Sequence, residues 1–354
     1  MKALITAGGH GTRLRPITHT QNKHLIPIAN KPILNYALEY VRDAGITEVG
    51  IITNQAGDEV REVYGDGSRL GLHLTYIPQE SPAGLAHCIK IAAPFLGEEP
   101  FVFYLGDNII VGGIRRFIAA FQERPTNCHL VLARVPDPER FGVPEIVNGR
   151  IVRIVEKPQK PMSDFAVTGI YIYDPSIFEA VNNIRPSARG ELEISDAHQY
   201  LLDKGKTVTF SEITGWWKDT GKPCDLLEAN RLVLDNIETR IEGLVDAMSV
   251  ISGRVVLENG AQVINSNVRG PAIIGQGTRI VNAYVGPYTA IAKHCEISNA
   301  ELEFSIISER CVIRNQKVRL EASLLGKDVQ IVESGTKPLV NRLIVGDQSR
   351  IEIS

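Results

Sequence analysis

Cysteine is scarce in this sequence, and its spacing gives no sign of a pairing framework. The 354 residues include five cysteines, an odd number, and no Cys-x-x-Cys pair occurs among them. Scattered cysteines argue against both a disulfide scaffold and a zinc knuckle, and they favour a reducing compartment. We therefore expect a cytoplasmic protein whose fold does not depend on cross-links.

Long apolar runs and a strong net charge are also missing. The apolar stretch after Met1 is too short for a signal peptide, and no later run has the length of a membrane span. The formal net charge is only -3, so the chain as a whole does not attract a polyanion. Because 44% of the residues are hydrophobic, we expect a globular protein. The short apolar runs and the low net charge lead us to expect no membrane partner and no nucleic-acid partner.

The first two thirds of the chain alternate short apolar runs with longer amphipathic stretches. This alternation is typical of βα units around a mostly parallel sheet and predicts an α/β domain over residues 1–240. The predicted strands cover Lys2–Ala7, Glu48–Thr53, Leu74–Ile77, Phe101–Leu105 and Leu130–Arg134, and a predicted helix covers Ile33–Ala44.

After residue 240 the helical pattern disappears, and aliphatic residues recur every five or six positions. They are Val263, Val268, Ile274, Ile280, Val285, Ile291 and Ile297. This period suits a parallel β-helix and resembles the hexapeptide repeat of left-handed β-helices. The alternative is an antiparallel β-sandwich, but Asn-Gly turns occur only at Asn148-Gly149 and Asn259-Gly260, outside the repeats. We expect a β-helix domain over residues 241–354.

The first predicted strand leads into a glycine-rich segment, Gly8-Gly9-His10-Gly11-Thr12-Arg13. A dinucleotide fingerprint would need glycine in place of Leu14, and a P-loop would need Gly-Lys followed by Ser or Thr. The segment can still bind an anion, because glycines at the end of a strand let backbone N–H groups approach it closely. Arg13 and the nearby Lys23 could neutralise a triphosphate and its departing pyrophosphate.

A longer series of motifs resembles the sugar-1-phosphate nucleotidyltransferase family. The series consists of Gly8-Gly9-x-Gly11-Thr12-Arg13-Leu14-x-Pro16, Lys23-x-Leu25-x-Pro27, Pro82-x-Gly84-Leu85-Ala86, Leu105-Gly106-Asp107-Asn108, Phe141-Gly142-Val143, Glu156-Lys157-Pro158, Val167-Thr168-Gly169-Ile170-Tyr171, Gly190-Glu191-Leu192-Glu193-Ile194 and Trp217-Lys218-Asp219-Thr220-Gly221. Within the family, Lys23-His24-Leu25 and the tryptophan motif resemble the members that use dTTP, with Lys218 as a departure. The resemblance implies a Rossmann-like catalytic domain followed by a left-handed β-helix.

The resemblance also implies an activity, a metal and roles for individual residues. The activity is transfer of a nucleoside monophosphate from dTTP to glucose 1-phosphate, with Mg²⁺ held by Asp107 and Asp219 on loops after strands. Arg13 and Lys23 would hold the triphosphate, and Lys157 the sugar phosphate. The remaining assignments are Gly8, Gly9, Gly11, Thr12, Gln79 and Gly84 for the nucleotide, and Gly142, Glu156, Thr168 and Tyr171 for the sugar.

Three other interpretations stay open at the level of sequence. The nucleotide could be UTP, or the sugar phosphate another one. His294 is the only histidine in residues 241–354, and it could act as a general base if the β-helix transferred an acyl group. A regulator that binds nucleotide sugars without turnover is the non-enzymatic alternative. We also expect a homo-oligomer, because the open ends and flat faces of a β-helix need covering.

Overall fold

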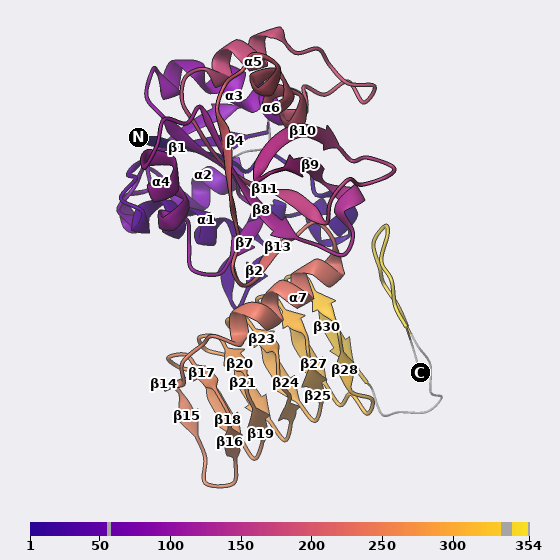
Figure 1. Ribbon diagram of the computed structural model, residues 1–354. Helices are drawn as coiled ribbons and strands as arrows, with labels where there is room; N and C mark the ends of the chain where they lie inside the picture. The colour runs from indigo at the N-terminus through magenta and orange to yellow at the C-terminus, as the bar shows by residue number, and fades with distance from the viewer. Residues whose placement is uncertain (55–57, 334–341, 353–354) are drawn as a thin grey trace. The chain divides into compact units, whose positions relative to one another are not determined.

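The computed structural model describes residues 1–54, 58–333 and 342–352 (Figure 1). The chain forms two compact units, one made of residues 1–10 and 33–219, the other of residues 11–32 and the chain from Thr220 onward. Among the described residues, no helix is both long enough and apolar enough to cross a membrane.

The first unit is an α/β structure. Its elements are β1 (Lys2–Thr6), α1 (Ile33–Asp43), β4 (Glu48–Thr53), α2 (Asp58–Tyr64), β5 (His73–Pro78), α3 (Leu85–Leu96), β6 (Phe101–Leu105), β7 (Asn108–Ile110), α4 (Arg115–Gln122), β8 (Cys128–Arg134), β9 (Gly142–Val147), β10 (Arg150–Glu156), β11 (Phe165–Tyr173), α5 (Ile177–Asn183), α6 (Ile194–Asp203), β12 (Val208–Glu212) and β13 (Trp217–Asp219). Short 3₁₀ turns cover Ser68–Leu70 and Pro138–Arg140.

The central sheet of this unit has nine strands. β6, β1, β4 and β5 are parallel neighbours in that order, and β11 runs antiparallel to β6 and joins β8 and β9 to the sheet. α3, α5 and α6 contact one another, and α1 contacts α4 (Figure 1). The predicted α/β fold is confirmed. The strand predicted over Leu130–Arg134 begins two residues earlier, at Cys128, and the helix predicted to end at Ala44 ends at Asp43.

Stacked aromatic rings lie within the mostly aliphatic core between this sheet and α3, α5 and α6. Phe103 stacks on Tyr171 with ring centroids 5.7 Å apart, and Tyr171 stacks on Tyr173 at 6.0 Å. His198 is fully buried beside them, and its Nε2 lies 2.6 Å from the hydroxyl of Tyr173. Because burial lowers the pKa of His198 to about 3, this histidine is neutral at physiological pH and acts as a core residue.

The second unit consists of one helix, a small hairpin and a β-helix. The parts before the β-helix are 3₁₀ turns over Thr12–Leu14, Ile17–His19 and Lys23–Leu25, then β2 (Pro27–Ile28), β3 (Lys31–Pro32) and α7 (Pro223–Leu234). The β-helix strands are β14 (Arg240–Ile241), β15 (Leu244–Val245), β16 (Val250–Ser252), β17 (Val255–Leu257), β18 (Gln262–Ile264), β19 (Asn267–Arg269), β20 (Ala272–Ile274), β21 (Arg279–Val281), β22 (Tyr284–Val285), β23 (Thr289–Ile291), β24 (Glu296–Ser298), β25 (Glu301–Glu303), β26 (Ile306–Ile307), β27 (Val312–Arg314), β28 (Leu320–Glu321), β29 (Leu324–Leu325) and β30 (Gln330–Val332).

These strands stack into three parallel sheets, of six, six and five strands. Aliphatic residues at the predicted positions, such as Val263, Ile280 and Ile297, are fully buried in the shared core. The predicted parallel β-helix is confirmed, and its coil spacing agrees with the left-handed hexapeptide type.

One corner of the β-helix is built from a ladder of asparagines. Asn265, Asn282, Asn299 and Asn315 have φ of 44°, 49°, 50° and 56°, the left-handed region that asparagine tolerates better than most residues. Each side-chain amide donates to the carbonyl of the next, at 2.7, 3.3 and 2.8 Å. Asparagine therefore serves at this corner where a β-turn would ordinarily need glycine.

The structure groups α7 and residues 11–32 with the β-helix, while the domain boundary predicted at residue 240 stays a prediction. The β-helix begins at Arg240, but α7 and residues 11–32 belong to the same compact unit as the β-helix. The reason is apolar packing: Leu234 of α7 forms one buried cluster with Val256, Ile273 and Ala290 of the β-helix. α7 thus runs close to the β-helix, and residues 235–239, which join the two, include no proline or glycine.

Candidate active site

The parallel strands β1, β4 and β6 end at one edge of the sheet, and glycines let the following loops pack closely there. A Cβ atom on Gly106 would lie 2.3 Å from the carbonyl oxygen of Thr6, and one on Gly8 would lie 3.0 Å from the nitrogen of Asn54. Only a residue without a side chain fits at Gly106. The loops that carry Gly8 and Asp107 therefore start from the same sheet edge, where open α/β sheets bind ligands.

Asp107 and Asp219 are brought together by a two-stranded antiparallel ribbon. β7 pairs with β13, and the register places Asp219 opposite Asn108, the residue that follows Asp107. Asp107 lies in the turn between β6 and β7, as predicted, but Asp219 is the last residue of β13 and not part of a loop. Both carboxylates are half-buried.

A chain of side chains holds Asp107 in place. The indole Nε1 of Trp217 donates to Oδ1 of Asn108 at 2.6 Å, and Nδ2 of Asn108 donates to Oδ1 of Asp107 at 2.9 Å. The Trp217 ring also meets Phe141 edge to face, with centroids 5.3 Å apart. The sequence interpretation assigned no role to Asn108 or Trp217, although both stand inside the matched motifs.

Gly142 and Glu156, both predicted to contact the sugar, are paired partners in the β9–β10 ribbon. The hydroxyl of Ser195, at the start of α6, donates to Oε2 of Glu156 at 2.7 Å. A Cβ on Gly142 would lie 2.7 Å from that hydroxyl oxygen, so a larger residue would displace Ser195. Gly142, Glu156 and Ser195 thus form one polar group.

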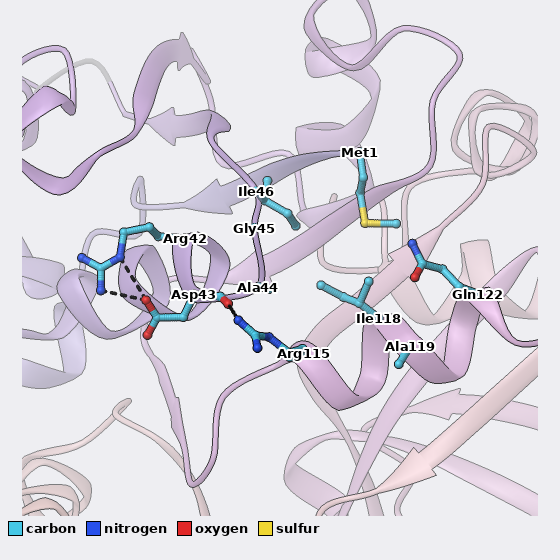
Figure 2. A pocket seen from close by; sticks show the side chains of 10 residues that line it. All are labelled: Met1, Arg42, Asp43, Ala44, Gly45, Ile46, Arg115, Ile118, Ala119 and Gln122. Atoms are coloured by element: carbon cyan, nitrogen blue, oxygen red, sulfur yellow. Dashed lines mark hydrogen bonds and ion pairs between the residues drawn. The ribbon is translucent and has the colours of Figure 1, made fainter.

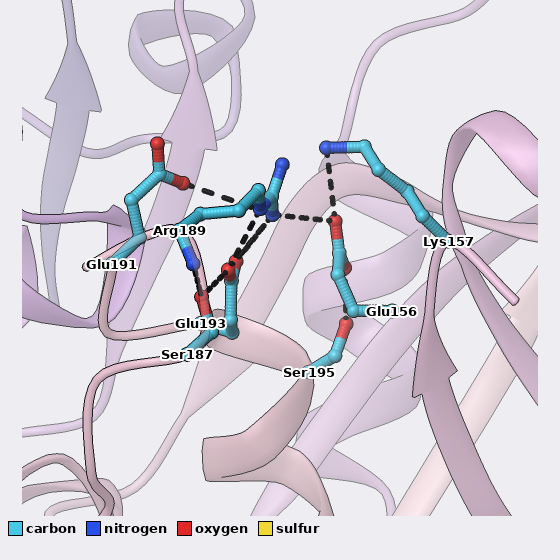
Figure 3. A network of polar contacts seen from close by, with 7 residues as sticks. All are labelled: Glu156, Lys157, Ser187, Arg189, Glu191, Glu193 and Ser195. Atoms are coloured by element: carbon cyan, nitrogen blue, oxygen red, sulfur yellow. Dashed lines mark hydrogen bonds and ion pairs between the residues drawn. The ribbon is translucent and has the colours of Figure 1, made fainter.

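Glu156 lies between two cations (Figure 3). Its Oε1 is 3.2 Å from Nζ of Lys157 and 3.6 Å from a terminal nitrogen of Arg189. Arg189 also binds both oxygens of buried Glu193 at 2.8 Å. Sequence reasoning missed Arg189, although it directly precedes the matched Gly190–Ile194 motif. Arg189 also lies 3.7 Å from Glu191, so two cations and three carboxylates form one network of ion pairs.

Two of the residues predicted to contact the sugar are buried in the fold. Thr168 is fully buried, and its hydroxyl donates to the carbonyl of Val131 at 2.8 Å. Tyr171 is 3% exposed and packs in the aromatic core, where burial raises its pKa above the usual value. Both side chains pack inside the protein, and a direct contact of either with a sugar stays a prediction.

The loop predicted to read the base is joined to the Gly190–Ile194 motif. The carbonyl of Leu192 accepts from the N–H of Ala86 at 3.1 Å, and a Cβ on Gly84 would lie 2.4 Å from the same oxygen. Gly84, with φ 100°, is therefore required by close backbone packing. Nε2 of Gln79 donates to the carbonyl of Gly84 at 3.2 Å, so the two predicted nucleotide residues are in contact.

The predicted triphosphate residues lie in the second compact unit. Gly11 has φ 60°, and a Cβ there would lie 3.0 Å from Cβ of Lys23. The hydroxyl of Thr18 donates to the carbonyl of Gly11 at 2.7 Å. Thr12 and Arg13 are exposed in the turn that follows, while Lys23 is half-buried. The turns bring Gly11 and Lys23 together.

A pocket of about 650 Å³ occupies a different place (Figure 2). It is lined by Met1, Arg42, Asp43, Ala44, Gly45, Ile46, Arg115, Ile118, Ala119 and Gln122. Met1 precedes β1 and Ile46 precedes β4, so this pocket lies at the amino ends of the strands. None of the residues predicted for the site lines it.

Two features bear on metal binding and on the β-helix alternative. Within the described part of the chain, three or more His, Cys, Asp or Glu residues do not gather into a metal cluster.

His294 is exposed on a left-handed turn with φ 59°, stacked over Gly277 of the preceding coil. Acyl transfer by this histidine stays untested.

Comparison with known proteins identifies the family. Residues 2–236 match the model of a family described as nucleotidyl transferase. The chain belongs to the nucleotidyl transferase family. The match covers both aspartates, Lys157, Arg189 and the glycine-rich segment, and ends just after α7.

Full-length relatives share the whole chain, including the β-helix. A glucose-1-phosphate thymidylyltransferase of Streptomyces griseus is 51% identical over 355 residues, covering 100% of both chains. A low-salt glycan biosynthesis nucleotidyltransferase, Agl11 of Haloferax volcanii, is 40% identical, again over 100% of both. The similarity to these relatives therefore extends beyond residues 2–236 and includes the β-helix region.

Solved structures of family members match one part of the chain. A Bacillus anthracis protein described as a glucose-1-phosphate thymidylyltransferase, in complex with sucrose, is 40% identical with a TM-score of 0.63, covering 68% of this chain and 97% of that one. A UDP-glucose pyrophosphorylase complexed with UDP-glucose is 26% identical with a TM-score of 0.61, covering 67% and 99%.

Proposed function

We propose that this chain transfers thymidine monophosphate from dTTP to glucose 1-phosphate, giving dTDP-glucose and pyrophosphate. The observation that carries the proposal is the β7–β13 ribbon, whose register pairs Asp219 with Asn108, the residue next to Asp107. Full-length identity of 51% to the Streptomyces griseus glucose-1-phosphate thymidylyltransferase supports the choice of substrates.

The chemistry needs alignment more than a protein nucleophile. A phosphate oxygen of glucose 1-phosphate, already ionised at neutral pH, attacks the α-phosphorus of dTTP, and pyrophosphate leaves with the electron pair of the broken bond. The two substrates are polyanions that repel each other, so catalysis depends on cations that hold them in line. Arg13 and Lys23 hold the triphosphate in this proposal, and Lys157 holds the sugar phosphate.

The residues present fit a hard divalent cation such as Mg²⁺. Mg²⁺ prefers oxygen ligands and is commonly held by one or two carboxylates together with substrate phosphates and water. Asp107, in the turn before β7, and Asp219, at the end of β13, would supply two carboxylates, and Asn108 and Trp217 fix the first of them. Bound there, the metal would neutralise charge on the phosphates.

The polar group around Glu156 suits recognition of the hexose. A buried acceptor left without a hydrogen-bond partner penalises a sugar of the wrong configuration, and Glu156 with Ser195 offers such groups beside Gly142. Arg189, on the other side of Glu156, is a second cation in reach of a sugar phosphate. Gln79 and Gly84 read the pyrimidine in this proposal.

The test of the function is pyrophosphate release from a panel of nucleoside triphosphates with glucose 1-phosphate and Mg²⁺. We expect the highest kcat/KM with dTTP, about tenfold or more above UTP, because a single methyl group discriminates only modestly. Chelation with EDTA should stop the reaction, and added Mg²⁺ should restore it. A higher kcat/KM with UTP would mean that UTP is the nucleotide substrate. If no triphosphate released pyrophosphate, the proposal would be contradicted.

Replacing either aspartate by asparagine should abolish turnover and leave the fold intact. Asp107→Asn and Asp219→Asn keep the size of the side chain but remove the negative charge that a divalent cation needs. We expect kcat to fall by about 10³-fold or more, as for loss of a key charge in an active site. Near wild-type activity in either variant, with unchanged circular dichroism, would remove that residue from the metal site.

Lys157→Ala should weaken the use of glucose 1-phosphate much more than the binding of dTTP. We expect the KM for glucose 1-phosphate to rise at least about tenfold, because a charge-assisted contact to the sugar phosphate is lost. Lys160→Ala, an exposed lysine three residues away, is the control. Equal losses for both substrates would mean that Lys157 serves the triphosphate.

A further inference from the structure

The hairpin formed by β2 and β3 has a strained turn. Ala29 and Asn30 join the two strands with φ of 47° and 61°, both in the left-handed region. Asparagine adopts this conformation readily, but alanine does so only at an energetic cost, because its Cβ then lies too close to the following carbonyl oxygen. Interactions outside the hairpin must therefore hold the turn in this shape.

Two side-chain amides hold the turn against α7 and the β-helix. Asn230 of α7 is 1% exposed; its Oδ1 accepts from the N–H of Ala29 at 2.9 Å, and its Nδ2 donates to the carbonyl of Tyr288 at 3.0 Å. Nδ2 of Asn30 donates to the carbonyl of Ile291 in β23 at 2.7 Å. The turn is thus bonded to this coil directly through Asn30 and indirectly through Asn230 of α7, and Ala29 packs on the buried cluster that contains Leu234.

The hairpin ends the segment that carries the two triphosphate cations. Residues 11–32 fold as consecutive 3₁₀ turns and then the hairpin, and Gly11 packs directly against Lys23. This segment belongs to the same compact unit as the β-helix. We therefore expect its conformation to depend on the contacts of the hairpin with α7 and β23.

We propose that Asn230 is a positioning residue for the reaction, and that the β-helix coil from Tyr288 to Ile291 supports the segment that binds the triphosphate. The inference rests on the proposed function. It means that the β-helix affects the binding of dTTP as well as any assembly of the protein into oligomers. It predicts that a change at Asn230 is felt at Arg13 and Lys23, which Asn230 itself does not touch.

The test compares Asn230→Ala with wild type in the full-length chain, by steady-state kinetics and by amide hydrogen exchange. We expect the KM for dTTP to rise about tenfold and the KM for glucose 1-phosphate to change less than about twofold, because the lost hydrogen bonds support only the triphosphate segment. Amides of residues 11–32 should exchange faster in the variant. Asn30→Gly, which keeps the left-handed turn but removes one bond, should show the same pattern more weakly.

The matched control is Asn236→Ala. Asn236 follows α7 and its exposed side chain donates to the carbonyl of Leu232 at 3.0 Å, away from the hairpin. This variant should match wild type in both measurements. Unchanged exchange in residues 11–32, or equal changes in both KM values, would overturn the inference. Failure of the proposed function would show instead as absent turnover in wild type, and hydrogen exchange would still test the support of the segment.

A second feature lies at the other end of the β-helix, where residues 343–352 repeat the sequence of a coil. Aligned with residues 272–281, they keep the same residue at four positions: Ile273 and Ile344, Gly275 and Gly346, Arg279 and Arg350, Ile280 and Ile351. They also keep the turn. Gln348 has φ 64° where Gly277 has 66°, and the N–H of Ser349 donates to the carbonyl of Gly346 at 3.4 Å, as Thr278 does to Gly275 at 3.2 Å.

The matching surface is the last coil. β29 and β30 end their sheets, so within the described residues each leaves one edge unpaired. Leu325 and Ile331 point into the core there, at the positions that Val345 and Ile351 would take in a following coil. Val345 and Ile351 are 57% and 48% exposed, which is unusual for coil aliphatics.

From these matches we infer that residues 343–352 add a further coil to the β-helix of their own chain by pairing with β29 and β30. Consecutive coils in the rest of the β-helix are consecutive in sequence, which favours the same chain over a second copy. Pairing would cover the open end of the core and satisfy the free strand edges.

Amide hydrogen exchange in dilute protein tests this inference. We expect amides of residues 343–352 to be protected about as well as those of β27 and β30, and Ile351→Asn to abolish the protection. Arg350→Asn, which alters the neighbouring outward position, should keep it. Exchange at the rate of an unstructured peptide would overturn the inference, and so would protection that vanishes on dilution, which would assign the coil to a second copy.

Discussion

Close approach of one backbone to another is the constraint on which the candidate site depends. Gly106 meets Thr6, Gly84 meets Leu192 and Gly142 meets Ser195 at distances that leave no space for a side chain. Because these contacts tie successive loops of the first unit to one another, Asp107 and the polar group around Glu156 stand on a connected framework. The glycines of the matched motifs are thus structural conditions for the site as much as ligand contacts, and Gly84 shows this most clearly.

Much of the architecture could be predicted from periodicity. The strands over Glu48–Thr53 and Phe101–Leu105 have the bounds that were predicted, and nearly all of their residues are buried. The spacing of aliphatic residues was enough to predict the β-helix. Short motifs named Asp107, Asp219, Glu156 and Lys157 as candidates. Only the structure shows that the β7–β13 register pairs Asp219 with Asn108 and that the β9–β10 register pairs Glu156 with Gly142.

The parts that sequence could not supply depend on contacts between distant segments. Arg189 stands 33 positions after Glu156 yet binds it, and Trp217 fixes Asn108 across 109 positions of chain. The burial of Thr168 and Tyr171 depends on which face of β11 meets the aromatic core, and a strand buried along its whole length gives no alternation to reveal this. The division of the chain was equally hidden, because the hydrogen bonds from Asn230 and Asn30 join segments about 200 or more residues apart.

The asparagine ladder has a consequence for how the β-helix can change in length. Each of the four rungs presents the same amide to its neighbours in the ladder, so the four coils that carry them share one connector. A whole coil could be duplicated or deleted between two rungs, and the amides on either side of the change would meet in the same geometry. The β-helix is in this sense a modular array, whose length can vary by complete coils while the support under the triphosphate segment stays fixed.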